Sequence, residues 1–359
     1  MVQAIKQPVV DFYLYPPVGD DDWRYLSQTA LVRMLELQML SRAALLDMAN
    51  AESFDQAADL LSAAEYVLPS TRNRFAEMES ILSLRRAELR QLFSQLMLNK
   101  AVIRIFRTRD DFANMRLAIR KVVTKKPLDA DFSSDGNISP EQFKQAFEQE
   151  KYELLPDYLQ EAAEQAVLAY YQTKDIRQID FTIDNIQAEY NLKMAQRLKN
   201  IFLLGLFRIH IDLTNIRTMF RLKFIQSQDQ FQQPSGHGVP AEPGDKFFLR
   251  GGYLTLERLK LALDAGYEAL GQLFFVTPYW RVVEAGANYL MSNKSFLKLE
   301  QQCEEHLTEF LKSTIQIVTG PQPIIAYFLM KENEIRNVRL ILTAKKNFLD
   351  TKLILDRIS

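Results

Sequence analysis

The residues that most often carry chemistry in proteins are sparse and scattered in this chain. Its three histidines are His210, His237 and His306, and its single cysteine, Cys303, lies near only His306. Metal sites and nucleophilic centres need such residues at set spacings, as in HExxH or CxxC, and no stretch of the chain has that spacing. We therefore expect no catalytic residue, no bound metal and no cofactor.

One glycine-containing stretch could suggest phosphate binding. Residues 235–246 read SGHGVPAEPGDK and include Gly244 and Lys246. A phosphate-binding loop needs the spacing GxxxxGK[ST], so that its backbone N–H groups surround the phosphates, and this stretch lacks it. We interpret it as part of a flexible surface loop at 226–246, and we expect a protein that is not an enzyme.

One polar pattern occurs three times along the chain. An acidic residue is followed after three positions by asparagine and after five by arginine, in apolar surroundings. The copies are Asp111, Asn114 and Arg116; Asp212, Asn215 and Arg217; and Glu334, Asn337 and Arg339. A pattern that recurs at long intervals is typical of proteins built from related structural units. The sequence therefore predicts three related helical units.

A structural role explains the repeated residues better than catalysis does. Five residues of a helix turn the chain by about 140°, so the acid and the arginine of one copy cannot pair with each other. Polar groups among apolar neighbours are buried only when they form hydrogen bonds. We expect each asparagine and arginine to bind a neighbouring helix or turn of its own unit; direct contact with a partner protein is the alternative. Replacing Asn215 or Arg217 by alanine should then cost about 1 to 3 kcal/mol.

Two weaker similarities support the repeat. Residues 46–66 match residues 259–279 without gaps, with an aromatic residue twelve positions before a tyrosine in each. Turns at Gly136 and Gly251 each precede an amphipathic helix, some way downstream of a repeated motif. Both similarities agree with units that share one helical plan.

A basic run lies around the first motif. Within 100–126 the only acidic residues are Asp110 and Asp111. A solvated helix face is the usual explanation of such a run. Arg120, Lys121 and Lys125 are nevertheless candidates for contact with an acidic partner surface or with lipid headgroups, because cations are attracted to both. The net charge of the whole chain is -1, so we expect no binding to nucleic acid.

Composition indicates a folded, all-α protein. The chain has 359 residues, 47% of them hydrophobic, with only 12 glycines and 13 prolines, and is long enough for two or three domains. A single cysteine permits no internal disulfide bond, and the N-terminal stretch lacks the apolar segment of a secretory signal. The longest apolar run, 201–207, is far shorter than the ~20 residues of a membrane-spanning helix. We expect a cytoplasmic protein without a transmembrane segment.

Apolar spacing predicts where the helices lie. Helical periodicity extends from 21 to 64 and from 71 to 107. After turn-forming residues it resumes from 140 to 225, with breaks near Pro156 and Arg177. Ser139 before Pro140 fits the start of a helix. No alternating pattern is long enough to predict a sheet. Beyond the loop, helical segments are predicted at 254–274, 295–319 and 323–358.

These motifs together resemble the family of C subunits of V/A-type rotary ATPases, the counterpart of the d subunit of eukaryotic V-type enzymes. The most specific similarities are the helix around Asn215, the turn Phe247–Gly252 and the closing helix around Asn337. The similarity extends from about Trp23 to the C-terminus. It departs from the family at 25–31, which replaces a more basic segment.

The resemblance implies three similar helical domains arranged around a pseudo-threefold axis, in the shape of a funnel. It also implies a central-stalk rotor subunit that couples the central shaft subunits to the proteolipid subunits of the membrane rotor ring. Such a subunit serves ATP-linked proton or sodium transport as a peripheral part of a membrane complex. The expected division is an N-terminal extension at 1–22 and repeats at 23–133, 134–250 and 251–359. A helical-repeat adaptor that binds other proteins outside any rotor is the alternative.

Overall fold

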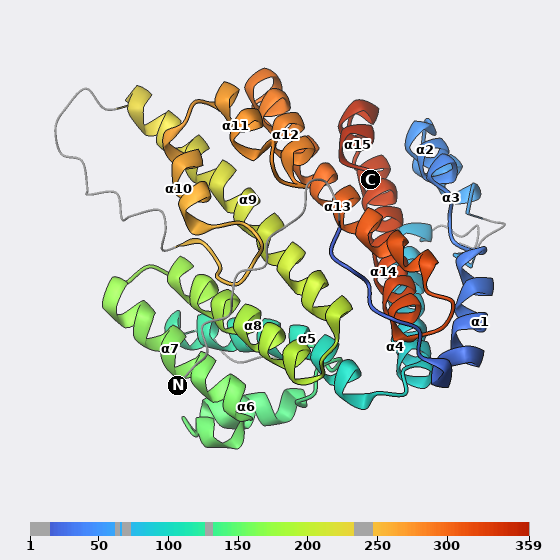
Figure 1. Cartoon of the computed structure of the whole chain (residues 1–359), viewed down its shortest axis with the longest axis horizontal. Helices are drawn as coiled ribbons and strands as arrows, with labels where there is room; N and C mark the ends of the chain where they lie inside the picture. The colour runs from blue at the N-terminus through green and yellow to red at the C-terminus, as the bar shows by residue number, and fades with distance from the viewer. Residues whose placement is uncertain (1–14, 62–64, 67–72, 126–131, 233–246, 359) are drawn as a thin grey trace. The chain divides into compact units, whose positions relative to one another are not determined.

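The computed structural model describes residues 15–61, 65–66, 73–125, 132–232 and 247–358 (Figure 1). Every regular element among these residues is a helix, which confirms the expected all-α class. The described residues form two compact units: a middle unit, 99–264, and a terminal unit, which combines 15–98 with 265–358. None of the described helices has both the length and the apolar character needed to span a bilayer.

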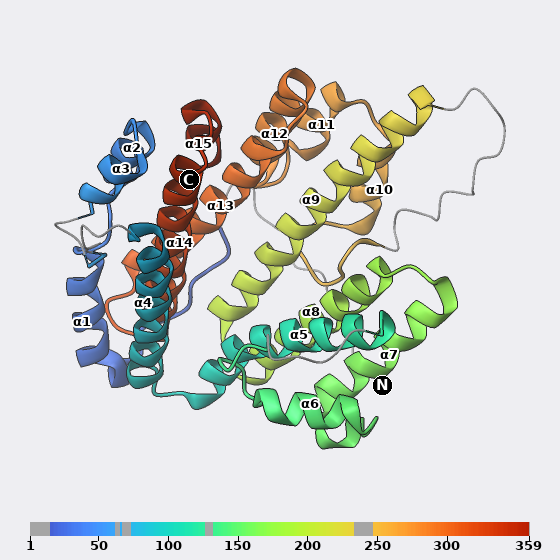
Figure 2. The same cartoon turned by 180° about the vertical axis from the view of Figure 1, so that it is seen from behind.

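The middle unit is organised around α5. This helix packs against α6, α7 and α8, while α9 packs against α8 and α10 (Figure 2). Among the described residues of this unit, the helices are α5 (Lys100–Val123), α6 (Pro140–Glu148), α7 (Asp157–Thr173), α8 (Arg177–Arg197), α9 (Ile201–Gln232), α10 (Leu256–Asp264) and the 3-10 helix η2 (Tyr152–Leu154).

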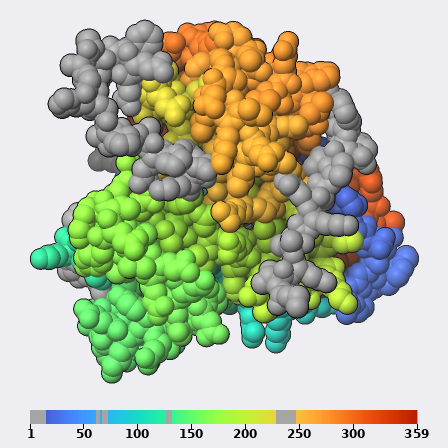
Figure 3. Space-filling view, turned by 60° about the vertical axis from the view of Figure 1, so that its left-hand side comes forward, coloured from blue at the N-terminus to red at the C-terminus, as the bar shows by residue number. Residues whose placement is uncertain are grey.

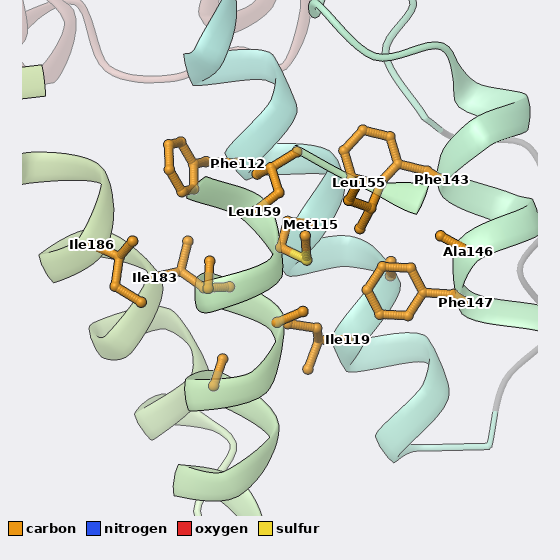
Figure 4. Packing of buried hydrophobic residues seen from close by; sticks show 14 of the residues in the cluster. Phe112, Met115, Ile119, Phe143, Ala146, Phe147, Leu155, Leu159, Ile183 and Ile186 are labelled. Carbon is orange, nitrogen blue, oxygen red and sulfur yellow. The ribbon is translucent and has the colours of Figure 1, made fainter. Parts of the chain in front are cut away.

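The core of the middle unit lies between α5, α6, α7 and α8. Phe112, Met115 and Ile119 recur at helical spacing on α5 and meet Phe143 of α6 and Ile183 of α8 (Figure 4). All five side chains are fully buried. Burial of each contributes about 1.5 to 3 kcal/mol, so this face holds the four helices together. In the space-filling view, side chains close the gaps between the green helices of this unit (Figure 3).

The terminal unit is organised around α14. This helix packs against α1, α2, α3, α4 and α13, and a stacked pair of rings, Phe93 and Phe328, joins α4 to α14. Among its described residues the helices are α1 (Leu26–Glu36), α2 (Arg42–Asn50), α3 (Phe54–Asp59), α4 (Arg74–Leu96), α11 (Tyr267–Phe274), α12 (Trp280–Asn293), α13 (Leu297–Lys312), α14 (Pro321–Lys346), α15 (Thr351–Arg357) and the 3-10 helices η1 (Trp23–Tyr25) and η4 (Ser313–Gln316).

Local signals account for several helix ends. Ser139 caps the start of α6 as expected. Its hydroxyl accepts the N–H of Gln142, the Gln142 side chain accepts the backbone N–H of Ser139, and Pro140 occupies the first turn. The prediction of one continuous helix at 71–107 is wrong, because the helix is interrupted between α4 and α5. The Asn99 side chain accepts the N–H of Ala101 there and starts a new helix.

Three other expectations about the helices are corrected. The helical stretch expected at 21–64 is divided, among its described residues, into η1, α1, α2 and α3. The loop expected from residue 226 begins later, since α9 continues to Gln232. The remainder of that expected loop, 233–246, lies outside the described residues. Helix α12 was not predicted, because Pro278 and Gly286 obscured its periodicity.

Candidate functional site: the repeated acid, asparagine and arginine motif

Asp111, the acid of the first motif, is completely buried on α5 and surrounded by donors. Its carboxylate accepts the backbone N–H groups of Asn137 and Ile138 at 2.8 and 3.1 Å. It also accepts the Asn137 side-chain amide at 2.8 Å and the Tyr158 hydroxyl at 2.9 Å. Burial raises the pKa of Asp111, and these hydrogen bonds oppose that shift. The carboxylate therefore holds the turn that leads into α6.

Asn114, one helical turn further along α5, binds the same turn. Its amide donates to the carbonyl oxygen of Ser133 at 2.8 Å and accepts the N–H of Ser133 at 2.8 Å. The turn requires glycine at position 136, because a Cβ at Gly136 would lie 2.2 Å from an Asp111 oxygen. We call this arrangement of acid, asparagine, glycine and turn a turn clamp.

The second motif forms a turn clamp of the same geometry. Asp212 accepts the N–H groups of Tyr253 and Leu254 at 2.9 and 3.0 Å. Asn215 donates to the carbonyl of Leu249 at 2.9 Å and accepts its N–H at 2.7 Å. A Cβ at Gly252 would lie 2.0 Å from an Asp212 oxygen. In both clamps the asparagine binds one residue of the turn. The acid binds the two residues that lie four and five positions after it.

The third motif binds a turn from the other end of the chain. Glu334 on α14 accepts the N–H of Leu40 at 2.7 Å and the Tyr66 hydroxyl at 2.6 Å, and it pairs with Lys331 at 2.8 Å. Leu40 directly precedes Ser41, which caps α2. Burial, followed by the charge of Glu334, raises the pKa of Tyr66. Asn337 is buried on the same helix.

The arginines of the motifs reach other helices. Arg116 pairs with Asp180, at 3.2 Å, and with Asp184, both on α8. Arg339 pairs with Glu79 of α4 at 3.2 Å. Arg217 is half-buried on α9. Where ion pairs of the motif arginines are described, they therefore join the motif helix to a second long helix.

The candidate contact residues Arg120, Lys121 and Lys125 differ in their surroundings. Arg120 pairs with Asp180 of α8. The Lys121 ammonium group lies 6.0 Å from the centre of the Phe132 ring, and Lys125 is exposed just beyond the end of α5. The structure thus places Arg120 in an ion pair within the chain.

His210 lies on α9, two residues before Asp212, whereas His306 and Cys303 lie on α13. His306 is buried on α13 between the rings of Tyr15 and Tyr279, and burial lowers its pKa to about 4. Cys303 is buried on the same helix, and His237 falls outside the described residues. No group of three potential metal ligands occurs in the part of the chain that the structure describes.

Sequence reasoning missed the turn at Leu40 and the register of the glycine turns. Gly136 corresponds to Gly252, and not to Gly251, because these two glycines contact the acids. The residue that caps the helix after each turn is the signal that could have located these turns. Ser139, Thr255 and Ser41 each start a helix that buries residues four and seven positions later. Those residues are Phe143 and Ala146, Leu259 and Ala262, and Leu45 and Met48.

The described residues thus form an all-helical protein in which the same turn clamp occurs on α5 and on α9. A family model described as ATP synthase (C/AC39) subunit matches residues 28–357, and the chain therefore belongs to that family.

Several known proteins are similar to the chain. The C subunit of a V-type sodium ATPase from Enterococcus hirae is 25% identical over 337 residues, which cover 93% of this chain and 97% of the relative. The C subunit of a V-type ATP synthase from Thermus thermophilus is 24% identical over 256 residues, covering 69% and 71%. The C subunit of an A-type ATP synthase from Methanococcoides burtonii is 28% identical over 149 residues, covering 41% and 38%.

Proposed function

We propose that this protein is a non-catalytic central-stalk subunit of a V/A-type rotary ATPase. It acts as a socket that couples the central shaft subunits to the membrane rotor ring of proteolipid subunits, for ATP-linked proton or sodium transport. It is peripheral to the membrane, on the cytoplasmic side. The family match over residues 28–357 carries the proposal, and the similar proteins are named as C subunits of V-type or A-type complexes. That match argues against an adaptor unrelated to a rotor.

The turn clamps support a mechanical role. Asp111, Asp212 and Glu334 are all buried carboxylates that accept several hydrogen bonds, so each fixes a turn against a long helix. Satisfied polar networks in a close-packed interior resist deformation and transmit strain. A subunit that passes torque needs this stiffness, and it needs no reactive residue.

The proposal includes three related modules around a pseudo-threefold axis, forming a funnel. The equal offsets in the first two clamps support a shared plan. The contact between Glu334 and Leu40 supports a third module, which takes its motif helix from the end of the chain and its turn from the beginning. In this proposal the motif helices α5, α9 and α14 begin the modules, whereas the division expected from the sequence, at 23–133, 134–250 and 251–359, places each of them in the later part of a repeat.

Reconstitution tests the proposed coupling role. A rotary complex that lacks this subunit should hydrolyse ATP without transporting ions, and addition of the purified chain should restore transport. The chain should also co-purify with a coiled-coil shaft subunit and with a proteolipid ring. Ion transport at full rate without the subunit, or ATP hydrolysis by the purified chain alone, would refute the proposal.

A variant tests the contribution of stiffness. Asn114→Ala combined with Asn215→Ala removes the asparagine contacts of two clamps, and should lower the number of ions moved per ATP in a complex that still assembles. Asn185→Ala on α8 is the control, because among the described residues its side chain binds only Phe181 of its own helix.

A further inference from the structure

Helices α5 and α8 run side by side in opposite directions, and opposite charges join them at one end. Arg116 and Arg120 of α5 pair there with Asp180 and Asp184 of α8. Further along, the rings of Phe112 and Tyr190 lie 6.4 Å apart. The basic run on α5 is therefore partly neutralised at its C-terminal end.

At the other end of this helix pair, like charges meet. Arg104 of α5 and Arg197 of α8 both lie near Tyr190: burial raises the pKa of the Tyr190 hydroxyl, and the charges of Arg197 and Arg104 oppose that shift. Exposed cations continue on both helices. The set, which we call the α5–α8 cation surface, comprises Lys100, Arg104, Arg107, Lys193 and Arg197.

This surface lacks neutralising groups. Residues 99–109 contain no acid, and Glu189 is the one acid within 189–199. Within the described ranges, no carboxylate forms an ion pair with any of the five cations. Like charges at neighbouring positions repel one another, so an external anion is favourable here.

We propose that the α5–α8 cation surface binds anionic phospholipid headgroups at a membrane surface. Protein interfaces are organised around buried aromatic or aliphatic anchors, whereas this surface consists of exposed cations that pair with no carboxylate of the described residues. Ile201, an exposed apolar residue four positions after Arg197 at the start of α9, suits shallow contact with a bilayer. The proposal rests on the proposed function, because a rotor subunit beside a membrane ring lies within reach of headgroups.

Vesicle binding tests this proposal. Purified full-length chain is sedimented with vesicles of phosphatidylcholine alone, or of phosphatidylcholine mixed with phosphatidylserine. Each Lys or Arg near an anionic surface strengthens partitioning by roughly fivefold, so Arg104→Gln, Arg107→Gln and Arg197→Gln together should weaken binding to the mixed vesicles roughly a hundredfold. Binding should also fall steeply with added salt.

The control is a second triple variant with the same change in net charge. Lys144→Gln, Lys151→Gln and Lys174→Gln neutralise exposed cations of the middle unit away from the surface, and should leave binding within a few fold. All six side chains are exposed, and circular dichroism melting verifies that both variants fold.

Three outcomes would overturn the proposal: no binding of the wild type to mixed vesicles, equal losses in both triple variants, or no loss in the first. Salt-dependent capture of an acidic protein by the same cations without vesicle binding would assign the surface to a protein instead. Co-purification with the shaft and ring is a separate measurement, so failure of the proposed function is distinguishable.

Discussion

Removal of the Asn215 side chain is the most direct test of the turn clamp. Asn215 is buried on α9 and satisfies both backbone groups of Leu249, at 2.9 and 2.7 Å. Asn215→Ala leaves a buried N–H and a buried carbonyl without these partners. Each lost partner costs about 1 to 3 kcal/mol, and part of the loss is recovered when the turn shifts toward water. We expect the free energy of unfolding to fall by about 2 to 4 kcal/mol.

Urea denaturation followed by circular dichroism measures this loss, with Asn185→Ala as the matched control. Among the described residues Asn185 binds only the carbonyl of Phe181 one turn earlier on its own helix, so its removal should change stability by less than about 0.5 kcal/mol. Asn215→Asp adds a second comparison: it keeps an acceptor for the Leu249 N–H but places a carboxylate oxygen against the Leu249 carbonyl. It should be at least as destabilising as alanine. Equal, small effects of Asn215→Ala and Asn185→Ala would refute the clamp.

Three further predictions use the same denaturation assay. Gly252→Ala should lower the free energy of unfolding by about 2 to 3 kcal/mol, because the new Cβ would lie 2.0 Å from Asp212. The control is Gly271→Ala on α11, where the nearest atom to a Cβ lies at 3.8 Å, and it should be neutral or stabilising. Equal effects of the two substitutions would contradict this account. Glu334→Ala leaves the Tyr66 hydroxyl and the Leu40 N–H without their acceptor, while the Lys331 ammonium keeps its ion pair with Glu65 at 3.1 Å; it should cost about 2 to 4 kcal/mol, with loss of amide-exchange protection in α2. Glu88→Ala at an exposed pair should cost less than about 0.5 kcal/mol. His306 has a pKa of about 4 in the folded protein against an ordinary 6.5. Its contribution to the free energy of unfolding is therefore complete above pH 6.5 and is lost as the pH falls toward 4. Relative to His306→Phe, the free energy of unfolding of the wild type should fall by about 3 kcal/mol across that window, and parallel pH profiles of the two proteins would contradict the burial.

The sequence predicted the helices that carry the motifs more reliably than it predicted what the motifs bind. Apolar spacing located α9 and α14, and the cap at Ser139 located the start of α6, because these signals are local. The break at Asn99 was missed because apolar periodicity continues on both sides of it. The contact between Glu334 and Leu40 joins residues 294 positions apart, and no local pattern reports such a pairing. The sequence did not predict the ion pair of Arg120 with Asp180 for the same reason.

The division of the chain into a continuous middle unit and a terminal unit made from both ends bears on how the protein is synthesised. Residues 99–264 can complete their core while translation continues, since domains generally fold as they leave the ribosome. The helices α1 to α4 emerge first but must wait for α14, which brings the carboxylate of Glu334 to Leu40. The earliest part of the chain to be made is therefore among the last to become native, and it needs protection from aggregation during the interval.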